Sequence, residues 1–306
     1  MYMQALQTLY TVHERTHETD PAAFAALAPR IVGVAATGES SVPRALLAQL
    51  PHAKVVSVFG VGYDGVDTAA ALAHKIPVTH TPDVLTDDVA DLAMGLLLSI
   101  GRRIPQADAF VKAGNWPQGP IALARKVSGS RIGIVGFGRI GQAIAKRAGA
   151  FGMSIAYTAR SEKTNCPHKF YASAAALAAQ VDFLVAITPG GAATKHLINA
   201  EVLSALGANG FLINVARGSV VDEEALIAAL QAGTIAGAAL DVFANEPHVP
   251  QALWALPNVV LTPHMASATT QTRQAMADLA FANMQAGIEG RALRTPVHEC
   301  QAMAGV

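Results

Sequence analysis

The sequence of 306 residues contains few cysteines and no excess of charge of either sign. Its two cysteines, Cys166 and Cys300, are too few for a disulfide scaffold and lack the spacing of metal ligands. We therefore predict no metal site and a reducing compartment, the cytoplasm. Lysine plus arginine and aspartate plus glutamate both number 22, so the chain has no global field that would attract nucleic acid or an anionic membrane.

Long hydrophobic runs are absent too. The longest extends from Leu92 to Ile100, far short of the roughly 20 residues that span a bilayer, and Met1 does not open a signal-peptide pattern. We expect a soluble protein with no membrane partner. Apolar residues nevertheless make up 52% of the chain, which predicts large buried cores, two for a chain of this length, and not disorder.

Short β-branched runs alternate with alanine-rich helical runs, which indicates βαβ units and parallel sheets. In the first third of the chain, helices are expected at residues 43–50 and 68–74. Thr86 or Asp87 begins a long helix, and its continuation over about 101–125 is expected to form an arm. The strands of this part are predicted at residues 30–36, 54–59 and 76–80.

A more regular series of six apolar runs follows, and a final amphipathic helix is expected at residues 269–290. Six strands with helices between them match the count of a complete doubly wound dinucleotide fold. We predict an α/β protein of two doubly wound parallel-sheet domains, with a Rossmann cofactor domain inserted in a smaller, flavodoxin-like substrate domain. The predicted domains are residues 1–98 with 270–306, and residues 99–269. The six strands are expected at residues 131–136, 154–158, 183–188, 210–216, 237–243 and 258–262.

A glycine motif, Gly136-Phe-Gly138-Arg-Ile-Gly141, follows the first of these six strands and opens the next helix. This context indicates a dinucleotide site more strongly than the motif alone. Gly136 permits a tight turn, Gly138 lets the backbone approach a pyrophosphate, and Gly141 allows close packing of helix on strand. The helix N-terminus adds free N–H groups. A tight turn without a ligand is the alternative.

The residues after the second strand bear on the choice of cofactor. A site for NAD places an acidic residue about 20 positions after the glycine motif, where it bonds the ribose 2′-hydroxyl. Here Ala159 stands in that place and is followed by Arg160 and Ser161, which can hold a 2′-phosphate. NADP is therefore favoured and NAD stays possible. The alternative is a solvated loop, in which Glu162 would be an ordinary surface charge.

Arg217, Glu246 and His264 each follow an apolar, strand-like run. Ligands of open α/β sheets bind beyond the carboxyl ends of the strands, so these three residues and Thr188 are candidates for one site. Arginine grips a carboxylate bidentately, histidine exchanges a proton with a carbonyl oxygen, and a glutamate on the second ring nitrogen fixes the tautomer. The pattern predicts reduction of a small anionic carbonyl compound by a nicotinamide cofactor. Taken singly, each residue also has a purely structural explanation.

A further glycine turn, Gly60-Val61-Gly62, follows the second strand of the first domain. The N–H groups of Val61 and Gly62 are candidates for holding a substrate carboxylate. An ordinary glycine turn is the alternative.

The complete set of expected cofactor residues is Gly136, Gly138, Arg139, Ile140, Gly141, Arg160, Ser161, Thr188, Val215, Asp241, His264 and Ser267.

Several stretches together resemble the D-isomer-specific 2-hydroxyacid dehydrogenase family over about residues 30–290. They are VGYDGVD, LTDDVADLAMGLLL, GIVGFGRIGQAIA, TPGGAATKHLIN, INVARGSVVDEEAL, ALDVFANEP and NVVLTPHMASAT. The resemblance implies that Arg217 binds the substrate, that Glu246 is the partner of the histidine, and that His264 is the acid/base. It also implies that Asp241 contacts the nicotinamide carboxamide.

Within the family, the chain looks most like the NADPH-preferring glyoxylate/hydroxypyruvate and hydroxyphenylpyruvate reductases. This likeness implies a homodimer built by the arm, in which Trp116 closes the partner's active site; simple packing of the arm is the alternative. An NAD-dependent dehydrogenase of hydroxyphenylpyruvate or phosphoglycerate type, or a cofactor-sensing corepressor without catalysis, remain alternative functions. The chain departs from the family at residues 1–14, which indicate a helix in place of the usual first strand.

Overall fold

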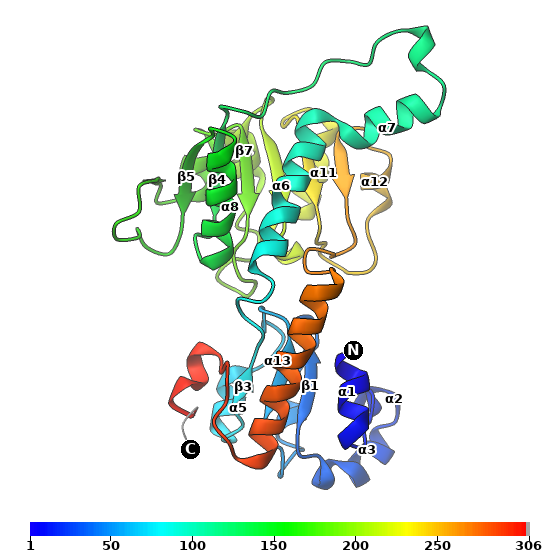
Figure 1. Ribbon diagram of the computed structural model, residues 1–306, viewed down its shortest axis with the longest axis vertical. Coiled ribbons are helices and arrows are strands. Elements are labelled where there is room, and N and C mark those ends of the chain that lie inside the picture. Colours follow the sequence, from blue (N-terminus) through cyan, green and yellow to red (C-terminus); the bar gives the residue numbers. More distant parts are fainter. Residues whose placement is uncertain (304–306) are drawn as a thin grey trace. The chain divides into compact units, whose positions relative to one another are not determined.

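The structure, a computed structural model, describes residues 1–303, which form two compact units (Figure 1). Unit 1 contains residues 1–85 and the chain from residue 267 onward, and unit 2 contains residues 86–266. Unit 2 is thus inserted into the sequence of unit 1. The predicted boundary at residue 98 falls within helix α6 (Thr86–Arg102), whereas the structure assigns this whole helix to unit 2, because it packs against other helices and strands of that unit.

Unit 1 is built on a three-stranded parallel sheet in the order β1-β2-β3. Val34 pairs with Val56, and Val56 pairs with Val78. Both Val56 and Val78 are fully buried, as expected for β-branched residues in a parallel sheet with covered faces. The strands are β1 (Val34–Thr37), β2 (Val56–Phe59) and β3 (Val78–Thr79), and the short helices of unit 1 are α2 (Thr16–Thr19), α3 (Pro21–Leu27), η1 (Ala28–Arg30), α4 (Arg44–Leu47), α5 (Thr68–Ala73) and η4 (His298–Met303).

The final helix of the sequence, α13 (Thr270–Glu289), packs against β2 in unit 1. The Ser57 hydroxyl of β2 donates a hydrogen bond to the Ala280 carbonyl oxygen of α13 at 2.8 Å. The helix predicted at residues 269–290 is therefore confirmed. Helix α1 (Tyr2–Leu9) packs against α13, so the opening segment is helical, as its sequence indicates.

Unit 2 contains a seven-stranded parallel sheet in the order β10-β9-β8-β7-β4-β5-β6. The prediction of six strands missed β6 (Lys169–Phe170), because a strand of two residues has no apolar run to reveal it. Strands β4, β5 and β6 extend to one side and β7, β8 and β9 to the other, which is the order of a doubly wound dinucleotide fold with its switch point between β4 and β7. The other strands are β4 (Arg131–Val135), β5 (Ser154–Thr158), β7 (Phe183–Ala186), β8 (Phe211–Asn214), β9 (Gly237–Leu240) and β10 (Val259–Leu261).

Helices cover both faces of this sheet. Ile134 of β4 meets α8, whereas its neighbour Gly133 meets Leu177 of α9, because successive residues of a strand point to opposite faces. Helices α6 and α8 lie side by side (Figure 1). No helix in the described part of the chain has both the length and the apolar character needed to cross a membrane. The remaining helices are α8 (Arg139–Ala150), α9 (Ala174–Ala178), α10 (Ala200–Leu206), η3 (Gly218–Val220), α11 (Glu223–Gln231) and α12 (Gln251–Trp254).

The segment after α6 forms an arm that extends away from the sheet of unit 2 (Figure 1). It contains α7 (Ile104–Lys112) and the short turn η2 (Trp116–Gln118), and none of the α7 side chains is buried. Four of its large apolar side chains are exposed instead. The exposed apolar residues of the arm are Ile104, Val111, Trp116 and Leu123.

Candidate active site

The glycine motif forms a tight turn between β4 and α8. Gly136 has a φ of +101°, and a Cβ atom there would lie 2.7 Å from the carbonyl oxygen of Ile187. A Cβ atom on Gly141 would lie 2.3 Å from the carbonyl oxygen of Gly136, so the helix and the turn approach too closely for a side chain. A Cβ atom on Gly138 would meet nothing within 4 Å. The turn therefore leaves open space at the N-terminus of α8, where free N–H groups favour a phosphate.

Thr188 lies beside this turn at the end of β7. Its backbone nitrogen would be 2.9 Å from a Cβ atom on Gly136. Its hydroxyl is buried and has no hydrogen-bond partner in the described part of the chain, a costly arrangement that a bound polar ligand would relieve. Val215 follows β8, and Arg139 and Ile140 form the first turn of α8. These residues share the carboxyl edge of the sheet, and their contacts with a cofactor stay predictions.

The loop after β5 carries the two residues expected to choose between NAD and NADP. Arg160 and Ser161 are exposed, and the preceding Ala159 places no carboxylate beside them. The backbone N–H of Lys163 donates to the hydroxyl of the buried Tyr157 at 2.8 Å. Since β5 pairs directly with β4, this loop and the glycine turn leave neighbouring strands at the same edge of the sheet.

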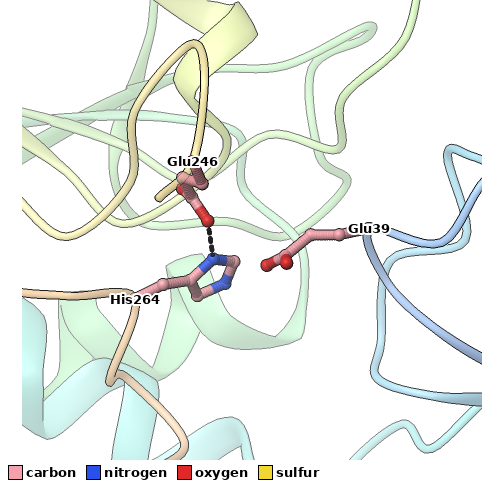
Figure 2. Close-up of side chains that lie close together, drawn as sticks. All are labelled: Glu39, Glu246 and His264. Carbon is pink, nitrogen blue, oxygen red and sulfur yellow. Dashed lines mark hydrogen bonds and ion pairs between the residues drawn. The ribbon is translucent and has the colours of Figure 1, made fainter. Parts of the chain in front are cut away.

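Glu246 and His264 are in direct contact (Figure 2). Oε2 of Glu246 is 2.7 Å from Nδ1 of His264, and Oε1 of Glu246 accepts a hydrogen bond from the Phe243 N–H at 2.9 Å. With Nδ1–H donating to Glu246, the predicted proton exchange with a substrate would use the other ring nitrogen, Nε2. The carboxylate also stabilises the protonated ring. The pair has the geometry of a general acid–base catalyst oriented by a carboxylate.

Arg217 follows β8 and precedes the short turn η3. The side-chain amide of the buried Asn214 donates to the Arg217 carbonyl oxygen at 3.1 Å. A Cβ atom on Gly218 would lie 1.9 Å from the carbonyl carbon of Phe243. The loop that carries Arg217 and the loop that leads to Glu246 therefore touch through their backbones. Asn214 and Gly218 are absent from the predicted site. A polar residue at the end of an apolar strand and a glycine next to the arginine are the signals that point to them.

Arg217, Glu246 and His264 follow β8, β9 and β10, which are neighbours in the sheet. Strand β8 pairs with β9 and β9 pairs with β10, both in parallel. All three residues therefore lie at the carboxyl edge of three adjacent strands of unit 2, the edge at which ligands of open α/β sheets bind.

Asp241 directly follows β9 and is fully buried. Its carboxylate accepts hydrogen bonds from the Thr262 hydroxyl at 2.6 Å and from the N–H groups of Met265 and Ala266, both at 2.9 Å. Burial raises the pKa of Asp241, whereas these three bonds and the nearby His264 lower it. Asp241 therefore holds the turn that carries His264, and its contact with a nicotinamide stays a prediction.

In unit 1, Val61 and Gly62 form the turn after β2. Nδ1 of His80 is 2.8 Å from the carbonyl oxygen of Val61, and the Thr81 N–H donates to the Gly60 carbonyl oxygen at 2.8 Å. Two residues that follow β3 thus hydrogen-bond to two carbonyl groups of the turn. The binding of a substrate carboxylate by this turn stays a prediction, as does a cofactor contact of Ser267.

A family model described as "D-isomer specific 2-hydroxyacid dehydrogenase, NAD binding domain" matches residues 94–266. The chain belongs to this family. The resemblance to D-isomer-specific 2-hydroxyacid dehydrogenases inferred from the motifs is therefore confirmed. Since the matched residues fall within residues 86–266, unit 2 is the NAD(P)-binding domain of the dehydrogenase.

Several dehydrogenases of known sequence or structure are similar to the chain over most of its length. Glyoxylate/hydroxypyruvate reductase A of Arabidopsis thaliana is 48% identical over 267 residues, which cover 87% of this chain and 84% of that protein. Hydroxyphenylpyruvate reductase of Plectranthus scutellarioides is 49% identical over 252 residues, covering 82% and 80%. The crystal structure of an NADPH-dependent glyoxylate/hydroxypyruvate reductase from Sinorhizobium meliloti, in complex with NADP and malonate, matches with a TM-score of 0.85 and 46% identity, covering 96% and 88%.

The switch point of this dehydrogenase fits a dinucleotide on structural grounds as well. The glycine turn leaves no room for a Cβ atom at Gly136 or Gly141 and open space at Gly138. The buried Thr188 hydroxyl beside it lacks a partner among the described residues. A pyrophosphate could occupy the open space at the N-terminus of α8, and a polar group of the cofactor could hydrogen-bond to the Thr188 hydroxyl.

Proposed function

We propose that this dehydrogenase reduces small 2-oxoacids with NADPH, and that glyoxylate and hydroxypyruvate are its leading substrates. The products are the 2-hydroxyacids, with the D configuration where carbon 2 is a stereocentre. The observation that carries the proposal is the 2.7 Å contact between Glu246 Oε2 and His264 Nδ1 at the carboxyl edge of the NAD(P)-binding sheet. The substrate class is supported by the relatives named for glyoxylate and hydroxypyruvate reduction, at 46–48% identity.

The side chains divide the chemistry between binding and proton transfer. Arg217 binds the substrate carboxylate through two hydrogen bonds and polarises the adjacent carbonyl group. When bound, NADPH supplies the hydride that reduces the carbonyl carbon. The protonated His264, oriented by Glu246, donates the proton that converts the carbonyl oxygen into the product hydroxyl. In unit 1, we assign carboxylate binding to the N–H groups of Val61 and Gly62.

The preference for NADPH is assigned to Arg160 and Ser161. The 2′-phosphate carries negative charge, which a guanidinium attracts and which an acidic residue at position 159 would repel. The NADPH dependence of the Sinorhizobium meliloti relative supports this assignment. For the rest of the cofactor, we assign the pyrophosphate to Gly138 and the first turn of α8, and the remaining contacts to Thr188, Val215, Asp241 and Ser267.

The partner of the chain is proposed to be a second copy of itself. The arm exposes four large apolar side chains, and Leu123 is 98% exposed. Several exposed large apolar side chains on one projecting segment favour a protein–protein interface. We assign the dimer contact to the arm at residues 101–125.

An activity assay of the purified protein tests the proposal. NADPH and NADH oxidation would be measured with glyoxylate, hydroxypyruvate and hydroxyphenylpyruvate. We expect turnover with the first two substrates and a higher kcat/KM with NADPH. Arg160→Ala should lower kcat/KM with NADPH by about 10- to 100-fold, since it removes charge-assisted hydrogen bonds, and should change the value with NADH less than twofold. Tight cofactor binding without turnover of any 2-oxoacid would make the protein a cofactor sensor instead.

Hydroxyphenylpyruvate is a second candidate substrate, because the Plectranthus scutellarioides relative is named for it at 49% identity. It shares the carboxylate and the 2-oxo group with hydroxypyruvate and differs only beyond carbon 3. The assignments of Arg217 and His264 are therefore the same for both substrates. A higher kcat/KM with hydroxyphenylpyruvate in the same assay would replace the leading substrates and keep the reaction.

A further inference from the structure

Tyr157 connects the glycine turn to the loop that carries Arg160. Its ring is fully buried at the carboxyl end of β5 and stacks on Phe137 of the glycine motif, with ring centroids 4.2 Å apart and an interplanar angle of 26°. Phe170 of β6 packs against Tyr157 with a centroid distance of 5.5 Å. The ring is thus fixed between the glycine turn and the neighbouring strand, and its hydroxyl has a fixed position.

The hydroxyl of Tyr157 is the acceptor for the backbone N–H of Lys163, at 2.8 Å. Lys163 lies three residues after Arg160 and two after Ser161. Burial raises the pKa of Tyr157 by more than the Lys163 bond lowers it, and the Cys166 thiol adds to the rise. The hydroxyl therefore stays protonated at neutral pH and offers a constant acceptor to the loop.

The second half of this loop also contacts the glycine motif, since the His168 ring meets the Phe137 ring edge-on with centroids 5.9 Å apart. A hollow of about 430 Å³ lies between the loop and α8. Its walls are side chains of both elements, so the space between them is not filled by protein. Phe137 and Lys146 line it on one side, and Lys163 and His168 on the other. In the first half of the loop, which carries Arg160 and Ser161, the hydrogen bond from Lys163 to Tyr157 ties the chain to the glycine turn.

We propose that Tyr157 is a positioning residue for cofactor selection: its hydroxyl anchors Lys163 and thereby holds Arg160 and Ser161 where they meet the 2′-phosphate. The inference rests on the proposed preference for NADPH. It adds that the preference depends on a buried residue that touches neither the 2′-phosphate nor the reacting atoms.

The test is Tyr157→Phe, which keeps the ring stack and removes only the hydroxyl. Loss of one hydrogen bond that orders a binding loop should lower kcat/KM with NADPH by about three- to tenfold, and the value with NADH by less than twofold. Binding provides a second readout that is independent of turnover. By calorimetry, the variant should bind adenosine 2′,5′-bisphosphate about three- to tenfold more weakly, with its affinity for adenosine 5′-monophosphate unchanged.

A double-mutant cycle with Arg160→Ala shows whether Tyr157 acts through the arginine. In the Arg160→Ala background, Tyr157→Phe should change kcat/KM with NADPH less than twofold, because the group that it positions is gone. Tyr171→Phe is the matched control, since Tyr171 lies just after β6 and its hydroxyl has no hydrogen-bond partner in the described part of the chain.

Three results would overturn the inference alone. One is an equal loss of kcat/KM with NADPH and NADH in Tyr157→Phe, which would mean that Tyr157 stabilises unit 2 as a whole and does not act on cofactor choice. The second is a loss that is undiminished in the Arg160→Ala background. The third is an unchanged kcat/KM with NADPH in Tyr157→Phe while the wild-type enzyme prefers NADPH. That result would leave the proposed function intact. A wild-type enzyme without any preference for NADPH would instead refute the proposed cofactor and the inference with it.

Discussion

Asp241 holds the backbone turn that presents His264. The N–H of His264 donates to the carbonyl oxygen of Asp241 at 2.8 Å. The Asp241 carboxylate in turn accepts from the two residues that follow the histidine, Met265 and Ala266. His264 has a φ of +49°, a left-handed conformation that residues other than glycine adopt rarely and at a cost. The buried carboxylate therefore stabilises a strained backbone at the proposed acid/base.

Replacing Asp241 by asparagine should lower kcat on the order of 10²-fold, because an amide offers one accepting oxygen in place of two and the histidine turn shifts. Steady-state kinetics would measure the loss, and thermal unfolding would show that the variant is folded. Thr262→Val removes one of the three donors to the carboxylate and should cost less, whereas Thr262→Ser keeps the hydroxyl. A kcat within twofold of the wild-type value in Asp241→Asn would refute this role.

His264→Ala should lower kcat by about 10²–10⁴-fold, because it removes the proton donor, and should leave NADPH binding largely intact. Rates with 2-oxoacid and cofactor affinity measured by fluorescence would separate the two effects. A rate within tenfold of the wild-type rate would show that another group supplies the proton.

Glu246→Gln keeps an oxygen that can accept from Nδ1 of His264 but removes the negative charge. Reduction needs the protonated ring, so its rate falls as the pH rises. Without the carboxylate the ring loses its proton more readily, and the fall should occur at lower pH than in the wild type. The pH profile of kcat checks this. A fall at the same pH in both proteins would show that Glu246 only orients the ring.

The site features that the sequence predicted are those that depend on local pattern. A glycine motif between a strand and a helix implies the close approaches that the structure has at Gly136 and Gly141. The strand-like runs likewise placed Arg217 and His264 at one edge of the sheet. In contrast, β6 has only two residues, and so no periodicity could reveal it.

The features that the sequence did not predict depend on contacts between distant residues. Asp241 bonds Thr262 and Ala266, which lie 21 and 25 positions away. The contact of Gly218 with Phe243 joins loops that follow two different strands. Such partners are set by sheet order and by loop paths, and neither leaves a local signal in the sequence.

The arm should mediate dimer formation through its exposed apolar side chains. Leu123→Asp, which adds a charge at a residue that is 98% exposed, should convert a dimer into a monomer, since a buried unpaired charge is costly. Analytical ultracentrifugation would measure the mass of both proteins. Trp254→Asp is the control, because Trp254 is 63% exposed on α12, outside the arm. A monomeric wild type, or dissociation by both variants, would contradict the assignment to the arm.

Asp182 should make unit 2 sensitive to acid. Its carboxylate bonds the Arg131 guanidinium at 2.9 Å, the Arg131 backbone N–H at 2.9 Å and the Arg125 guanidinium at 2.8 Å. The Arg131 hydrogen bond is the main cause of the lowered pKa of Asp182, and burial opposes it. The folded state therefore binds fewer protons here than the unfolded state. The resulting stabilisation is complete above the unfolded pKa of about 4 and is lost as the pH falls through the lowered value.

Asp182→Asn should therefore destabilise the protein at neutral pH by about 1–2 kcal/mol, a value that allows for the exposure of both guanidinium groups. The difference from the wild type should shrink as the pH falls below about 4, because protonation removes the same charge from the wild type. Thermal unfolding followed by circular dichroism across this range would measure it. Asp108→Asn is the control, because Asp108 pairs only with the exposed Lys112 on α7 among the described residues. A constant difference between Asp182→Asn and the wild type at every pH would mean that the side chain acts through its shape and not through its charge.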